Sequence, residues 1–146
     1  MNYDKLYDIK CVYRLQPKDT EELKSYFYKK QGWVYIAKSK DNPHLKIGRT
    51  SKNPLERAKT LSSTGVFSHY EIIFSMKAFN QFWVEKIIHD KLKRFRISKE
   101  FFSVQESLAI DAIENTVIEE SILLKRFLKL EIITEDIELI EYSLKK

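Results

Sequence analysis

The middle of the chain contains two short β-rich runs followed directly by a helix with clear ends, and this order leaves few possible folds. The runs are WVYIA (33–37) and LKIGR (45–49), separated by turn residues, and this pattern is typical of a β-hairpin. Asn53 and Pro54 then supply a helix cap and a first helical residue, and Gly65 suits the left-handed position after the last turn. We therefore predict a hairpin followed by a helix of about three turns.

The next segments extend this unit. HYEIIFSMKA (69–78) has the composition of a third strand, and Asn80 can cap the amphipathic segment FWVEKIIHDKLKRFR (82–96). EFFSV (100–104) is a short extended piece that follows it. The order predicts an α+β fold in which a small central three-stranded antiparallel sheet is flanked by helices, with extra helices at the N- and C-terminal ends.

The flanking segments have helical patterns. CVYRL (11–15) has the pattern of a short strand, and EELKSYFYKK (21–30) predicts a leader helix with acids in its first turn. Residues 106–130 and 131–146 have apolar residues at helical spacing with acids between them. We therefore divide the chain into an N-terminal leader (1–31), a central domain (32–104) and an acidic helical C-terminal appendage (105–146).

Composition restricts the class of protein. The chain has 146 residues, the length of one ordinary domain, and 43% of them are apolar, which is enough for a core. Cys11 is the only cysteine, so the sequence offers no disulfide scaffold and no cysteine-rich zinc site. A signal peptide and an 18-residue apolar run are both missing. We expect an intracellular protein, cytoplasmic or nuclear, that does not enter a membrane.

Charge is distributed unevenly along the chain. Residues 29–99 hold 16 Lys and Arg against 5 Asp and Glu, a net charge of +11. Residues 105–146 hold 5 against 10, a net charge of −5. A basic block of this size fits contacts with the phosphates of a nucleic acid, but an ordinary solvated surface fits it equally well.

Four motifs occur in order between Gly32 and Val104, namely VYI, KIGRT followed by P-x-x-R, E-x-x-x-H, and R-x-x-x-EFF. Together they resemble the GIY-YIG nuclease superfamily. The resemblance is closest to the branch named after a phage open reading frame 172, also called the meiotically up-regulated gene 113 family. It covers about half of the chain, and four spaced motifs are more specific than any one of them.

This resemblance implies hydrolysis of a phosphodiester bond and assigns roles to four residues. Tyr35 is the tyrosine of the first motif and Gly48 the glycine of the second. Glu85 is implied to bind Mg²⁺ or Mn²⁺ through a hard carboxylate oxygen, with water completing the shell. Tyr35 is implied to deprotonate or orient the attacking water, and Arg57 to neutralise charge that develops on the phosphate.

The chain also departs from the motif pattern. Lys46 stands where many relatives have tyrosine, and its ammonium can hold a phosphate or favour ionisation of Tyr35. Leu61 stands where many superfamily nucleases carry His or Tyr, so His89 is a substitute candidate. Helical spacing places Glu85, His89 and Arg96 on one polar stripe beside an apolar one, although a surface Glu–His pair has the same spacing.

A further acid comes from the last motif. Glu100 can pair with Arg96 or shape the cleft, while the two phenylalanines after it are expected to bury against the sheet.

Three functions follow from these patterns. The first is a divalent-metal-dependent DNA endonuclease that uses Tyr35, Arg57 and Glu85, with Lys46 and His89. The second is a DNA-binding module of the same fold that does not cleave. The third is a protein-interaction domain that uses the acidic C-terminal helices. The expected partner is DNA, most simply double-stranded, and the flanking helices offer a homodimer contact. The residues expected to contact nucleic acid are Arg49, Lys52, Lys59, Lys93, Arg94 and Arg96.

Overall fold

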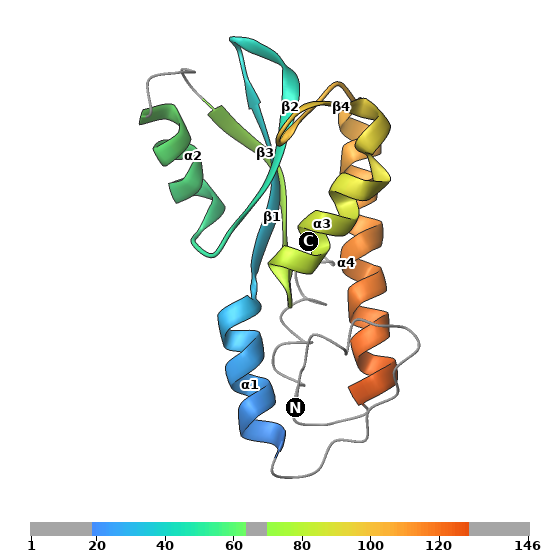
Figure 1. The fold of residues 1–146 in the computed structure, drawn as a ribbon. Helices are drawn as coiled ribbons and strands as arrows, with labels where there is room; N and C mark the ends of the chain where they lie inside the picture. The colour runs from blue at the N-terminus through green and yellow to red at the C-terminus, as the bar shows by residue number, and fades with distance from the viewer. Residues whose placement is uncertain (1–18, 64–69, 129–146) are drawn as a thin grey trace.

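A computed structural model of the protein describes residues 19–63 and 70–128 (Figure 1). The elements in chain order are α1 (Asp19–Lys30), β1 (Gly32–Ser39), β2 (Asn42–Thr50), α2 (Pro54–Ser63), β3 (Tyr70–Ala78), α3 (Gln81–Lys91), a 3₁₀ turn η2 (Lys93–Phe95), β4 (Arg96–Ser98), β5 (Phe101–Phe102) and α4 (Glu106–Leu128). Cys11, the strand expected at 11–15, the helix end expected at Gly65 and the helix expected at 131–146 lie outside the described residues.

The hairpin and its helix are confirmed. β1 and β2 pair antiparallel, with Tyr35 opposite Gly48 and Ala37 opposite Lys46. α2 begins at Pro54, and the Asn53 side chain accepts a hydrogen bond from the Leu55 N–H at 2.9 Å. The fixed φ of proline and the side-chain oxygen before it therefore start this helix as expected.

The sheet has five strands, so the prediction of a three-stranded sheet was wrong. Its order is β3-β1-β2-β5-β4, and every pair is antiparallel. The fourth and fifth strands have three and two residues, too few for an alternating pattern to be visible in the sequence. The fold remains α+β, and the described residues form four α-helices beside the larger sheet.

The helix expected over 82–96 also ends earlier than its amphipathic pattern indicates. α3 stops at Lys91, and Arg96 has the extended backbone conformation in which β4 begins. Lys99 has a φ of 45°, in the left-handed region, where the chain turns from β4 into β5. The tail of the expected helix is therefore the 3₁₀ turn η2 followed by the first residue of β4. β4 and β5 form a small hairpin, and β5 pairs with β2 so that Phe102 lies opposite Leu45.

The two faces of the sheet carry different cores. Val34, Ile36 and Ile47 belong to a large buried cluster with residues of α3 and α4, whereas Tyr35 and Ala37 belong to a smaller cluster on the other face. Figure 1 shows α2 on one side of the sheet and α3 with α4 on the other. Alternation along β1 thus sends successive side chains into two separate layers.

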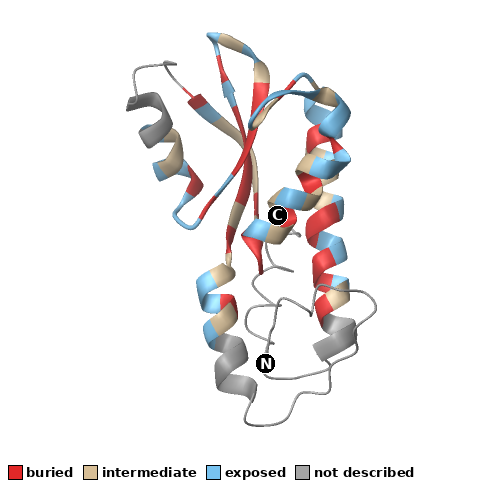
Figure 2. Cartoon of the chain, viewed as in Figure 1, coloured by how far each residue is buried: buried red, intermediate tan, exposed pale blue. Residues whose placement is uncertain are grey.

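Helix α4 is part of the main core. Its residues Ala109, Ile113, Val117 and Leu124 are buried in the same cluster as the sheet, and Figure 2 shows a buried stripe along the helix. The carboxylate of buried Glu120 accepts hydrogen bonds from the two backbone N–H groups at the β3–α3 junction, at 2.8 and 3.0 Å. α4 therefore supports the start of α3 as well as the sheet.

Candidate active site

Three residues of the first two motifs meet on the face of the sheet that α2 covers. The ring of Tyr35 lies where a side chain at Gly48 would point, because a Cβ there would stand 2.7 Å from the tyrosine oxygen. Arg57 of α2 donates a hydrogen bond from Nε to the same oxygen at 3.3 Å. Tyr35 is fully buried and Arg57 half-buried. Position 48 must therefore be glycine, because a larger residue would occupy the space in which the Tyr35 ring lies over β2 and reaches Arg57 of α2.

Glu100, on the turn between β4 and β5, brings a carboxylate to the same place. It forms an ion pair with the ammonium of Lys46, which is almost fully buried and lies 5.5 Å from the ring centre of Phe101. A Cβ at Gly48 would stand 3.4 Å from Glu100 Oε2, so this oxygen lies on the same face as the Tyr35 hydroxyl. The Glu100 carbonyl also accepts a hydrogen bond from the backbone N–H of residue 47 at 2.9 Å.

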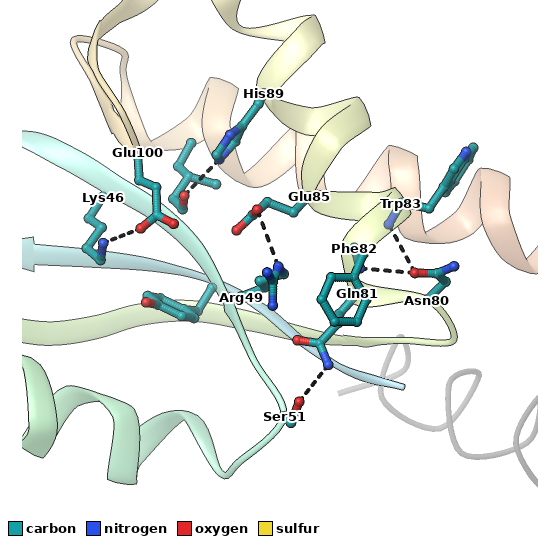
Figure 3. A network of polar contacts seen from close by, with 12 residues as sticks. Lys46, Arg49, Ser51, Asn80, Gln81, Phe82, Trp83, Glu85, His89 and Glu100 are labelled. Atoms are coloured by element: carbon teal, nitrogen blue, oxygen red, sulfur yellow. Dashed lines mark hydrogen bonds and ion pairs between the residues drawn. The ribbon is translucent and has the colours of Figure 1, made fainter. Parts of the chain in front are cut away.

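Glu85 approaches the same edge of β2 from α3. Its Oε1 lies 3.6 Å from Arg49 Nε, and Figure 3 shows the two side chains directed toward each other. Oε2 is buried and has no hydrogen-bond partner among the described residues. Burial raises the pKa of Glu85 to about 7, the charge of Glu100 adds to this, and the cations Arg49, Lys46 and Arg96 oppose it. We call Tyr35, Lys46, Arg57, Glu85 and Glu100 together the edge site.

The two acids of the edge site suit a divalent cation. An unpaired buried carboxylate oxygen beside a second carboxylate is unfavourable, and a cation would satisfy both. Within the described residues no three His, Cys, Asp or Glu side chains come together, so a cation at this place would take its protein ligands from these two carboxylates. This fits Mg²⁺ or Mn²⁺, which keep waters and take phosphate oxygens in a site with few protein ligands.

His89 is held by the backbone of β2. Its Nε2 lies 2.9 Å from the carbonyl oxygen of Ile47, and because a carbonyl only accepts, the proton is on Nε2. The ring packs against Phe102 at 5.0 Å between ring centres. Burial lowers the pKa of His89, which keeps the ring neutral near pH 7. The imidazole therefore ties α3 to β2, and sequence reasoning did not indicate this contact.

The residues expected to contact nucleic acid lie on different elements. Arg49 is exposed on β2 and stacks over Phe82, with 4.0 Å from the guanidinium carbon to the ring centre. Arg96 lies in β4 and not on the helix, and its Nε donates to the Lys99 carbonyl. Four others are exposed, on the β2–α2 connection, on α2 and on η2, namely Lys52, Lys59, Lys93 and Arg94. Among these six residues, Arg49 forms an ion pair with Glu85, and the charge of Arg96 also acts on that carboxyl.

Glu100 is a functional candidate whose partner the sequence did not identify. It was expected to pair with Arg96 or to help shape the cleft, and in the structure its carboxylate pairs with Lys46. The sequence feature that pointed to Glu100 was the R-x-x-x-EFF motif, in which this acid directly precedes the two residues of β5. Its orientation depends on the turn at Lys99 and on the pairing of β5 with β2, and neither is visible in the sequence.

Comparisons with known proteins place this geometry in a family. The sequence model of the T5orf172 domain matches residues 32–117, which is more than half of the chain and includes the whole sheet and every residue of the edge site. No curated protein and no solved structure matches the chain. By this match the chain belongs to the T5orf172 domain family.

Proposed function

We propose that this protein is a divalent-metal-dependent nuclease of the GIY-YIG type, which hydrolyses phosphodiester bonds in DNA at the edge site. The family match supports a nuclease-like or DNA-binding role. The observation that carries the proposal further is the unpaired, buried Oε2 of Glu85 beside the carboxylate of Glu100. Two neighbouring acids would repel a phosphate unless a cation binds beside them, so a module used only for binding has no need of them.

Each residue of the edge site has a distinct role in this proposal. Glu85 holds the cation, with Glu100 as the neighbouring carboxylate. When bound, the cation stabilises negative charge on the phosphate and on the leaving oxygen. Arg57 faces the phosphate with the four N–H donors that remain beside the Nε–H given to Tyr35. Tyr35 is fully buried, so we assign it the positioning of Arg57.

The proton of the attacking water also has a defined acceptor. Water attacks phosphorus, the bond from phosphorus to the leaving oxygen breaks, and we assign the released proton to Glu100. Lys46 holds this carboxylate in place. The leaving oxygen takes a proton from solvent. Bond changes and charge therefore balance with water as the only co-reactant.

A second function is favoured by one observation, the complete burial of Tyr35 together with the pairing of Lys46. If these two residues serve packing alone, the domain binds DNA through its basic surface and does not cut. This alternative predicts salt-sensitive binding in which neither Mg²⁺ nor Glu85 matters.

A plasmid-nicking assay separates the two functions. Supercoiled DNA is incubated with the protein in Mg²⁺ or Mn²⁺, with EDTA as one control, and Glu85→Ala is compared with Glu119→Ala. Glu119 is an exposed acid on α4 that pairs with Lys91, so it controls for loss of a negative charge. We expect nicking that EDTA and Glu85→Ala abolish and Glu119→Ala leaves unchanged. Binding without nicking contradicts the nuclease, and nicking that survives Glu85→Ala contradicts the edge site as the place of cleavage.

A further inference from the structure

A hollow of about 260 Å³ lies where the end of α1 meets the sheet. It is lined by Tyr28, Lys29, Gln31, Trp33, Ser51 and Lys77. We call this hollow the α1 subsite. Trp33 and Tyr35 are two residues apart on β1 and therefore face the same side of the sheet, so the subsite opens on the face where Arg57 meets Tyr35. It is thus the nearest neighbour of the edge site along the strand.

The walls of the α1 subsite are fixed by a buried carboxamide. Gln81, at the start of α3, has no exposed surface, and its Nε2 donates to the Gln31 carbonyl at 3.1 Å and to Ser51 Oγ at 2.8 Å (Figure 3). A Cβ at Gly32 would stand 2.5 Å from this nitrogen, so only glycine leaves room for it. The first residue of α3 therefore connects the end of α1 with the end of β2, and these hydrogen bonds fix the shape of the α1 subsite.

The lining combines aromatic rings with cations. Tyr28 is 78% exposed, which is unusual for so large an aromatic side chain. Lys29 follows it on α1. Lys77 lies opposite Trp33 on β3, with its ammonium 5.6 Å from the ring centre. Rings for stacking and ammonium groups for phosphates are the combination with which proteins bind single-stranded nucleic acid.

We propose that the α1 subsite holds an unpaired nucleotide of the substrate strand, next to the phosphate that is cut. The proposal rests on the proposed nuclease function. A base that stacks on Tyr28 has left its own helical stack, so the favoured substrate is a single strand or a junction between single and double strands. Tyr28 and Lys29 lie outside the residues that match the family, so α1 adds this preference to the domain.

Binding of a labelled oligothymidylate and of a blunt duplex tests the subsite. Both are measured by fluorescence anisotropy in a Glu85→Gln background, which removes the proposed cleavage and the acidic charge. We expect Tyr28→Ala to weaken oligothymidylate binding at least about fivefold, the loss of one stacking contact. Tyr28→Phe keeps the ring and should keep the affinity. Neither change should alter duplex binding.

A pair of lysines supplies the matched electrostatic control. Lys29→Ala should lower the salt dependence of oligothymidylate binding by about one phosphate contact. Lys40 is exposed in the β1–β2 turn, away from the α1 subsite, so Lys40→Ala should leave this salt dependence unchanged.

Three results overturn the proposal in distinguishable ways. Unchanged oligothymidylate binding in Tyr28→Ala refutes the α1 subsite alone. The proposed nuclease function is then tested separately, by plasmid nicking with the unaltered protein. An equal loss on single strand and duplex shows that the nucleotide need not be unpaired. Failure of the parent protein to bind either nucleic acid refutes the proposed function and the subsite together.

Discussion

Replacing Glu85 with glutamine should stabilise the protein, and the gain should grow with pH. The pKa of Glu85 is raised from 4.5 to about 7 in the folded protein, first because the carboxyl is buried and then because Glu100 is near. At 1.36 kcal/mol for each pKa unit, this shift corresponds to about 3 kcal/mol. The side chain is only 16% exposed, so solvent screens little of this energy.

The direction of the effect follows from proton linkage. A carboxyl with a raised pKa in the folded state contributes its full stability below the unfolded pKa of about 4.5, and this contribution is lost as pH rises through about 7. Glutamine resembles the protonated acid and carries no charge at any pH. Between pH 4.5 and 8 the wild type should therefore lose about 3 kcal/mol relative to Glu85→Gln.

The measurement is urea or thermal unfolding of both proteins in EDTA across this pH range. For a chain of this size, about 3 kcal/mol corresponds to a midpoint difference of roughly 6–12 °C at pH 8. Mg²⁺ should then raise the midpoint of the wild type and leave that of Glu85→Gln unchanged, because a ligand stabilises only the state that binds it. A difference in stability that stays constant from pH 4.5 to 8 would refute the reasoning.

Two substitutions and one NMR measurement test contacts around the edge site and the core. Gly48→Ala forces a Cβ to within 2.7 Å of the Tyr35 oxygen, so we expect a loss of about 1–3 kcal/mol in urea unfolding together with loss of nicking, and an unchanged unfolding midpoint would contradict the close contact. Glu120→Ala leaves two buried backbone N–H groups without their acceptor, and each should cost roughly 1–3 kcal/mol in the same assay, whereas an exposed surface acid should cost less than about 1 kcal/mol. His89 should show a neutral ring protonated on Nε2 in ¹⁵N NMR at pH 7, because burial lowers its pKa, and a neutral ring protonated on Nδ1 instead would rule out the bond to Ile47.

Local signals were sufficient for the hairpin and for the starts of two helices. Pro54 begins α2, and the side chain of Asn80 accepts hydrogen bonds from the N–H groups of Phe82 and Trp83 at the start of α3, as expected of a helix cap. Proline and asparagine act on the backbone within three residues of themselves. Such effects can be read from the sequence because they do not depend on the rest of the fold.

The remaining features depend on contacts between distant segments. β4 and β5 exist because β5 pairs with β2, more than 50 residues earlier in the chain. The pairing of Lys46 with Glu100 follows from this register, so the sequence could name both residues but could not join them. The apolar spacing of residues 106–130 predicted a helix, but the position of α4 against the sheet depends on the large core that the two share.

The carboxylate of Glu120 also has a consequence for synthesis of the chain on the ribosome. The backbone groups that it holds belong to the β3–α3 junction, about 40 residues earlier. Until residue 120 has left the exit tunnel, these N–H groups have only water as a partner. The face of the sheet that carries Val34, Ile36 and Ile47 also lacks the apolar side chains of α4. The nascent chain can therefore complete its hairpin early, but Glu85 becomes fixed beside Arg49 only after α4 has been made.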